Sequence, residues 1–461
     1  MIDGWDTIMD KKANIPVPEP VRRDAVPKRS AAFKEHADTW LENNVHRFDP
    51  SLGEIPEKRE IRRKAFTEAA LYLHVAEMQG DVTTPQLKEL LVSRTNDESF
   101  YSLLVRTPTE LNKIGYPLVY LAEIDELDRD AQRVLNDVLE WPETWATSLP
   151  PSRQLDLWHI CRMYGYTDHP LDFRRLLDQG NVNRYLSPAR VGQNDAFGLT
   201  HELLYYHNLG SGSDKFPDEP LAYDYPSVLQ GLLLRFIAEG HTDLVAELLL
   251  CGVLQRQLPP GFVRFVLGWI LDHVDDDGYL SFPVDSPEKL KRFVGYDPAD
   301  WQNQNETWRC YYHPTIVGGL LARALTDAWP ELDTEANRRP IDYRSQAENL
   351  VKLGDVFALF ANYSLEQGAT YLRELSETPV VEEYGDVVAH AVRFLETQRR
   401  SDGTFGCWTD EQRLFTSKHE SNTEADFREE LLQPVSETCE SAIEAVRSDL
   451  DGAIDDGPEL A

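Results

Sequence analysis

The sequence predicts an all-α fold on two observations. Apolar residues recur three and four positions apart, the spacing of an amphipathic helix, as in Phe66, Ala69, Ala70, Leu73 and Ala76. No stretch alternates apolar and polar residues over the length of a strand, and no Asn-Gly hairpin turn occurs. The chain has 461 residues, 41% of them apolar, so it can bury a large helical core.

The same spacing, together with residues typical of helix starts, defines the elements in chain order. At Thr84-Pro85 and Thr107-Pro108 a hydroxyl suited to capping precedes a proline suited to the first helical position. Helices are expected at residues 33–46, 57–79, 84–93, 108–124, 127–139, 151–164, 169–178, 195–208, 225–238, 241–250, 260–274, 310–328, 343–375 with a break, 382–398 and 424–448.

Four segments follow from this pattern. Residues 1–30 are expected to be a flexible arm, 31–150 an N-terminal helical region, 151–448 the main helical domain and 449–461 an acidic tail. Residues 31–150 form either a separate domain or outer helices of the main one; the absence of a Pro/Gly linker favours continuity, with a seam near residues 149–151. The loops that contain residues 210–213 and 295–305 are expected to form a rim or lid.

Charge excludes several functions. The chain carries 79 acidic against 46 basic residues, a net charge of −33, which repels nucleic acids and anionic membrane surfaces. Only 13 of the basic residues are lysines, and this composition is typical of proteins adapted to concentrated salt. Molar salt shortens the Debye length to about 3 Å and screens self-repulsion. The acids are therefore interpreted as a halophilic outer surface.

Cysteine usage and apolar stretches predict a cytoplasmic protein. Five separated cysteines form no CxxC pair, so neither a disulfide framework nor a zinc ribbon is indicated. The N-terminus lacks the basic and apolar regions of a signal peptide. The apolar stretches at 262–274 and 316–325 contain arginines and are too short to span a membrane.

A turn motif carries a family resemblance. Two apolar helices, 262–271 and 388–395, run into Asp-Gly turns at Asp277-Gly278 and Asp402-Gly403. The segment Gln398 to Trp408 resembles the turn repeated in the α/α toroids of terpenoid cyclases and protein prenyltransferases. This resemblance implies an α/α toroid, a six-hairpin-like barrel of inner and outer helices around a central funnel, with extra N-terminal helices.

A second resemblance concerns two histidine segments. Residues 199–210 contain Thr200-His201, and residues 311–319 contain Tyr312-His313. These segments resemble an uncharacterised toroid-like family, a domain of unknown function, whose members carry a Thr-His and a later Tyr-His segment. The resemblance implies no activity but indicates which residues to examine.

His201 and His313 are the candidate catalytic residues. His201 lies in a helix that is apolar over most of its circumference, and His313 begins another with few acids nearby. If both helices enter a funnel from the same end, the two imidazoles can serve as general acid and base. The alternative is that each is a core histidine bonded to a carbonyl or tyrosine. Four aromatic residues are candidates for substrate binding or, alternatively, for core packing: Tyr205, Tyr206, Trp308 and Tyr312.

The sequence assigns no metal and no cofactor. His201 and His207 are about 240° apart on a helix and cannot share an ion, whereas Cys310 and His313 are about 60° apart. Protein prenyltransferases hold zinc with Asp, Cys and His, so the combination of Cys310 with His201 and His313 stays open. The acidic run Asp275–Asp277 is interpreted as a solvated turn.

Two functions remain open. The first is an enzyme that binds a peptide, isoprenoid or other small substrate in a funnel beside His201 and His313. The second is a noncatalytic helical scaffold or binding protein with structural histidines, whose protein partner is unknown. The charge favours the interior in either case, because acids are expected outside and are scarce around both histidines.

Overall fold

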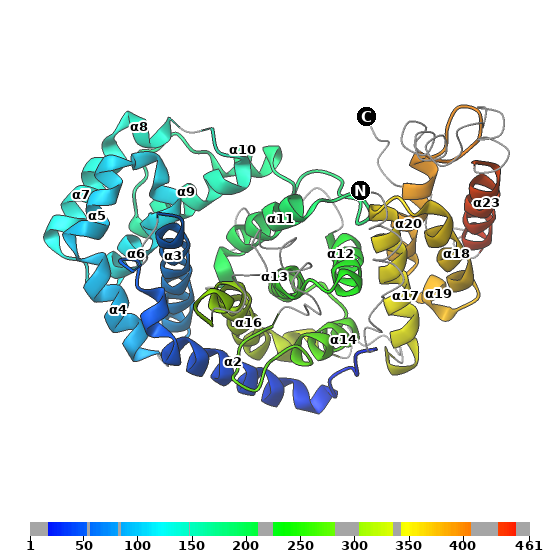
Figure 1. Cartoon of the computed structure of the whole chain (residues 1–461), viewed down its shortest axis with the longest axis horizontal. Coiled ribbons are helices and arrows are strands. Elements are labelled where there is room, and N and C mark those ends of the chain that lie inside the picture. The colour runs from blue at the N-terminus through cyan, green and yellow to red at the C-terminus, as the bar shows by residue number, and fades with distance from the viewer. Residues whose placement is uncertain are drawn as a thin grey trace.

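The computed structural model describes residues 17–52, 56–81, 84–146, 148–210, 225–281, 304–334, 343–406 and 432–448. Within these residues the fold is all-α, as predicted, and the only β pairing is two isolated bridges. The α-helices shown in Figure 1 are α2 (Val26–Asn43), α3 (Pro56–Met78), α4 (Pro85–Thr95), α5 (Glu98–Arg106), α6 (Leu111–Glu123), α7 (Arg129–Glu140), α8 (Pro142–Trp145), α9 (Pro151–Tyr164), α10 (Phe173–Gln179), α11 (Gln193–Tyr206), α12 (Tyr225–Glu239), α13 (Thr242–Gln255), α14 (Pro260–Leu271), α16 (Gln304–Leu332), α17 (Tyr343–Ala361), α18 (Leu365–Ser376), α19 (Pro379–Glu383), α20 (Gly385–Thr397) and α23 (Gln433–Arg447).

Most predicted helices match these bounds, and the differences have local causes. Helix α2 begins at Val26, inside the expected arm. Helix α5 was not expected, because it has only nine residues; Asp97 caps it by accepting a hydrogen bond from the Ser99 amide at 2.8 Å. The loops expected as a rim lie mostly outside the described residues.

Six helices contact one another in a closed cycle. The contacts run α3, α6, α9, α11, α13, α16 and back to α3. The helices between them in sequence pack against members of the cycle: α4 on α3 and α6, α10 on α9, and α12 and α14 on α13. The chain therefore alternates between the cycle and its surroundings, and the cycle joins helices from both sides of the expected seam.

The C-terminal helices form a further group at one end of the molecule, on the right of Figure 1. Helix α17 packs on α12, α18 on α17, and α23 on α18. Gly354 permits the first contact, since a Cβ at this position would lie 2.3 Å from the backbone oxygen of Leu234.

The two Asp-Gly turns share one geometry. Antiparallel bridges pair Val274 with Leu280 and Arg399 with Phe405. Gly278 and Gly403 adopt φ values of 91° and 84°, which favour glycine. Leu280 and Phe405 occupy equivalent positions and are fully buried, so each turn is anchored by one apolar side chain. The repeat seen in the sequence is therefore a structural repeat.

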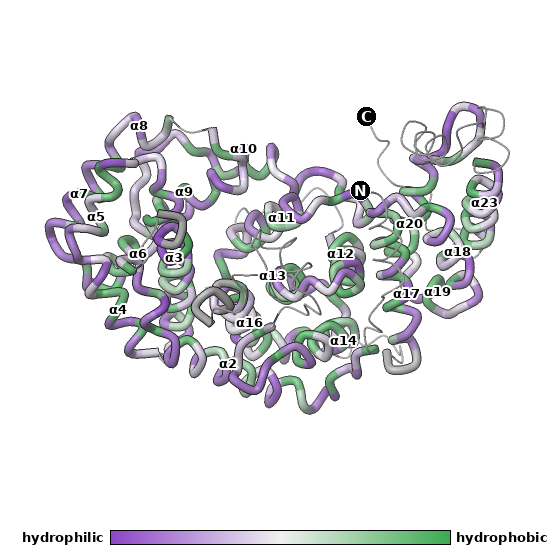
Figure 2. The backbone as a smooth tube through the Cα atoms, in the orientation of Figure 1, coloured by the Kyte–Doolittle hydropathy of each residue, from purple (hydrophilic) through white to green (hydrophobic). Residues whose placement is uncertain are grey.

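Hydrophobic and hydrophilic residues alternate along most helices in Figure 2, as expected for helices buried on one side. Among the described helices, none combines the length and apolar character needed to cross a membrane. The expectation that acids mark the outside is wrong for several residues, because Asp38, Asp156, Glu202, Asp243 and Glu247 are buried. All five contact polar groups that are described below.

One buried ion pair ties the N-terminal helix to the cycle. Arg323 of α16 donates from Nη2 to both carboxylate oxygens of Asp38 in α2, at 2.8 and 3.0 Å, and from Nη1 to Asp81 at 2.7 Å. The Arg323 side chain is only 1% exposed. Tyr72 also donates a hydrogen bond to Asp38.

Candidate functional site

Polar side chains from all six helices of the cycle form two neighbouring clusters. A carboxylate cluster surrounds His313, and a second network surrounds Asp156. The contributing residues are Glu68 of α3, Tyr116 of α6, Arg153, Asp156 and His159 of α9, Thr200, His201 and Tyr205 of α11, Asp243 and Glu247 of α13, and His313 of α16.

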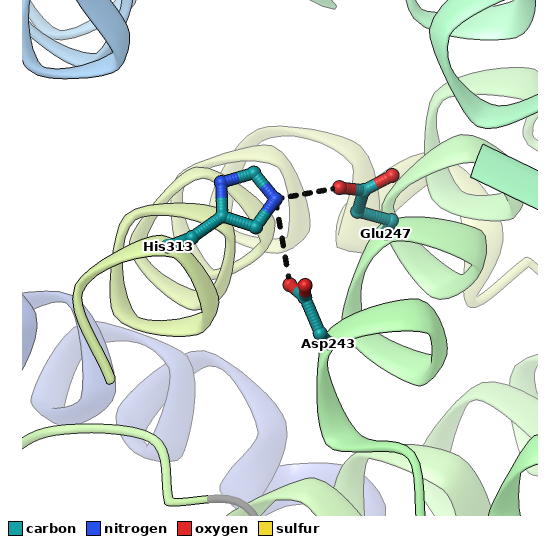
Figure 3. A group of neighbouring side chains, drawn as sticks. All are labelled: Asp243, Glu247 and His313. Carbon is teal, nitrogen blue, oxygen red and sulfur yellow. Dashed lines mark hydrogen bonds and ion pairs between the residues drawn. The ribbon is translucent and has the colours of Figure 1, made fainter. Parts of the chain in front are cut away.

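Three carboxylates face the imidazole of His313. Its Nε2 lies 3.0 Å from Glu247 Oε1 and 3.6 Å from Asp243 Oδ1, as Figure 3 shows. Its Nδ1 lies 3.1 Å from Glu68 Oε2. Asp243 and Glu247 are four residues apart on α13, so both point to the same side of that helix. Thr200 donates a hydrogen bond to the second carboxylate oxygen of Glu247.

This arrangement shifts the proton affinities of its members. Burial alone would lower the pKa of His313, but the carboxylates of Asp243 and Glu68 raise it well above its ordinary value. Burial raises the pKa of Asp243 to about 7; His313 opposes this shift, and Glu247 and Glu68 add to it. Burial would also raise the pKa of Glu68, but His313 and Lys64 hold it at about 2. The carboxylates thus stabilise the protonated form of His313.

The second network orders His201. Asp156 Oδ1 lies 3.5 Å from His201 Nδ1 and accepts a hydrogen bond from the Tyr205 hydroxyl at 2.7 Å. Tyr116 donates to Tyr205 at 3.1 Å and lies 3.1 Å from His159 Nδ1. Burial raises the pKa of Asp156, but hydrogen bonding and charge attraction from His201 lower it below its ordinary value.

The two histidines influence the same carboxylates and reach solvent. The charge of His201 lowers the pKa values of both Glu68 and Glu247, the two carboxylates that contact His313. The side chains of His201 and His313 are 24% and 20% exposed, whereas His159 is almost fully buried. The clusters are therefore electrostatically coupled, and each presents one accessible imidazole.

The four predicted substrate-binding aromatics occupy different environments. Tyr205 belongs to the Asp156 network. Tyr206 is buried and makes an edge contact with the His207 ring at 5.0 Å. Trp308 and Tyr312 stack at 4.8 Å and pack edge-on against Phe48. Both of these side chains are buried, as the alternative of core packing expects.

The group of possible metal ligands differs from the one left open by the sequence. Within the described residues, Asp243, Glu247 and His313 offer ligand atoms that all lie within 4.8 Å of one another. This group contains neither Cys310 nor His201. Cys310 is buried one turn before His313 on α16.

Sequence reasoning missed Glu68, Asp156, Asp243 and Glu247 because acids were assigned to the surface. A signal for two of them was present in α13. That helix is otherwise almost entirely apolar, and its only acids are Asp243 and Glu247, one turn apart. Acids paired at this spacing on an apolar helix indicate a buried polar site.

A cavity of about 480 Å³ lies apart from these clusters. It is bordered by the segment from Tyr185 to Asp195 and by α20 residues including Arg393 and Thr397. None of its lining residues belongs to the two clusters. His390 lies beneath it, between the hydroxyls of Tyr185 and Ser227, both at 3.0 Å.

Comparison with known proteins gives a family and no activity. No curated protein and no solved structure matches the chain. The model of the family described as "Domain of unknown function (DUF6895)" matches residues 34–323, which run from α2 into α16. That span includes Glu68, His201 and His313 and covers more than half of the chain. The protein therefore belongs to the DUF6895 family.

Proposed function

We propose that the protein is an α/α-toroid enzyme that acts on a small molecule or peptide at the interior of the six-helix cycle. The alternation between cycle helices and surrounding helices is the arrangement that a toroid requires. The single observation that carries the enzyme proposal is the accessible His201, ordered by a buried carboxylate and coupled to the cluster around His313.

His201 supplies the proton-transfer group. A carboxylate on one ring nitrogen fixes the orientation and tautomer of an imidazole and stabilises its protonated form. Asp156 contacts Nδ1 of His201, which leaves Nε2 to exchange a proton with a substrate. The hydrogen-bonded chain from Tyr116 through Tyr205 holds Asp156 in place.

The carboxylate cluster supplies the negatively charged part of the site, which we call its acidic pole. Glu68, Asp243 and Glu247 outnumber the two cationic groups beside them, His313 and Lys64. Such a pole attracts a cationic group, so the substrate class that fits best carries a positive charge or is bound through one. The acidic, lysine-poor composition further favours action in the cytoplasm of a cell that contains concentrated salt.

Two conservative variants test this proposal. Purified protein is incubated in molar salt with a small-molecule extract of the cells that produce it, and turnover is followed by mass spectrometry. We expect His201→Gln to slow the conversion of at least one metabolite by roughly 10²- to 10⁴-fold, the usual contribution of general acid–base catalysis. Asp156→Asn is expected to have a similar effect, and the double variant should be no slower than His201→Gln alone because the two residues act as a unit.

His390→Gln is the matched control, since it replaces another histidine without touching the clusters. It should turn over the metabolite at the wild-type rate. Equal turnover by wild type and His201→Gln contradicts the role of His201. A wild-type protein that converts nothing, but retains a bound protein or ligand, supports the noncatalytic scaffold instead.

A further inference from the structure

The atoms that surround His313 Nε2 have the arrangement of an incomplete metal site. Asp243 Oδ1 of α13 lies 3.6 Å and Glu247 Oε1 of the same helix 3.0 Å from His313 Nε2 of α16 (Figure 3). The three residues offer ligand atoms that lie within 4.8 Å of one another. Ligand atoms about 2.1 Å from a shared ion are separated by roughly 3 to 4 Å. A small adjustment of these side chains therefore suffices to enclose an ion.

A buried oxygen without a hydrogen bond points into this space. From the part of the chain that the structure describes, Asp243 Oδ1 accepts no hydrogen bond, although the side chain is only 9% exposed. His313 Nε2 lies 3.6 Å from it. A buried carboxylate oxygen without a donor is costly, and a bound cation removes that cost.

The neighbours of the three candidate ligands have the positions that outer residues occupy in metal sites. A ligating histidine usually donates its other ring nitrogen to a carboxylate, and a ligating carboxylate is itself hydrogen-bonded. Glu68 Oε2 lies at an ion-pair distance of 3.1 Å from His313 Nδ1, without the geometry of a hydrogen bond, and Thr200 donates to Glu247. Each of these two ligands therefore has beside it the kind of neighbour that a metal site uses.

From this geometry we propose that Asp243, Glu247 and His313 bind one divalent transition-metal ion, with Glu68 and Thr200 orienting the ligands. Two carboxylate oxygens and one imidazole nitrogen, without sulfur, favour Zn²⁺ or Mn²⁺ over soft ions. Three protein ligands leave a coordination position for a substrate or water, as in catalytic sites. The ion would also be the positive charge through which the acidic pole holds a substrate.

Metal titration tests the site without an assay of turnover. Protein stripped with a chelator is titrated with Zn²⁺ and separately with Mn²⁺ in molar KCl, and binding is measured by competition with a metal indicator. We expect one equivalent to bind to the wild type. Asp243→Asn and Glu247→Gln should each weaken binding at least about 100-fold, and Glu68→Gln about 10- to 100-fold.

Glu202→Gln is the matched control, because Glu202 is a buried acid of α11 that accepts the Val182 amide and lies outside the ligand group. It should bind like the wild type. Circular dichroism confirms that each variant is folded. Absence of stoichiometric binding to the wild type, or several weak sites unaffected by the Asp243 and Glu247 variants, overturns the proposal. A wild-type protein that binds no metal but shows turnover dependent on His201 would overturn this inference and leave the proposed function standing. Metal binding without turnover would contradict only the proposed function.

Discussion

Replacing Arg323 with alanine is expected to lower the free energy of unfolding by about 3–5 kcal/mol. Arg323 is fully buried between α16 and α2 and bonds both oxygens of Asp38. Removing the guanidinium takes away the positive charge that faces the buried Asp38 carboxylate, to which the Tyr72 hydroxyl still donates. The cost comes from losing this counter-charge at a buried position, so it should far exceed that of an exposed pair.

Denaturant unfolding in molar KCl measures this effect. The control is Arg256→Ala, which breaks an exposed ion pair with Glu331 and should cost less than about 1 kcal/mol. Adding Asp38→Leu to Arg323→Met should restore much of the lost stability, since a matched apolar pair replaces both charges. Similar small losses for Arg323→Ala and Arg256→Ala would show that Arg323 is not buried against α2.

Acidification is expected to destabilise the protein steeply between pH 6 and 5. Burial lowers the pKa of His159 to about 3 and that of His390 to about 4, whereas both take up protons near pH 6.5 when the chain unfolds. Because the two histidines bind protons in the unfolded chain before they do so in the folded protein, the free energy of unfolding decreases as the pH falls below about 6.5. Two other groups cancel each other in this pH range. Burial lowers the pKa of His241 to about 4, so His241 takes up a proton on unfolding. Burial raises the pKa of Asp243 to about 7, so Asp243 releases one.

His159 and His390 together make the unfolded chain bind about two more protons, which contributes about 2.7 kcal/mol per pH unit to the slope. Unfolding of the chelator-treated protein is measured in molar KCl, so that protonation of surface acids changes self-repulsion little. His390→Gln should halve this contribution. A flat or rising stability from pH 6 to 5 would mean that these histidines are protonated in the folded protein.

The sequence predicted the helices well where a long apolar stripe and a boundary proline coincide. Helix α9 begins at Pro151 and ends at Tyr164, as expected, because Gly165 adopts a left-handed φ of 73° at its end. Short α5 was missed because its nine residues repeat the apolar spacing only once, from Phe100 to Leu103 and Leu104. The helix expected to start at residue 108 begins instead with one 3-10 turn, Pro108–Glu110, before α6. The Thr107 hydroxyl does not cap this turn but donates to the carbonyl oxygen of Leu103.

Of the histidines and acids in the candidate site, the sequence singled out only two histidines, His201 and His313. His201 and His313 could be singled out because imidazoles on apolar helices are conspicuous. Among their carboxylate partners, only Asp243 and Glu247 had a local signal, as the two acids of an otherwise apolar helix. Glu68 and Asp156 had none, because an acid in a chain of net charge −33 looks like one more surface charge. Their burial depends on contacts between helices far apart in the sequence, such as that between α3 and α16.

His201 and His313 are proposed to belong to one site that holds a cation. Histidine ring signals of the chelator-stripped, ¹³C-histidine-labelled protein, assigned with single variants, can be followed by nuclear magnetic resonance as one equivalent of Mn²⁺ is added. Paramagnetic broadening is expected for His313 and His201 together, while the signal of His390 stays sharp. Broadening of His313 without His201 would contradict a shared site, and broadening of neither would contradict the cation site itself.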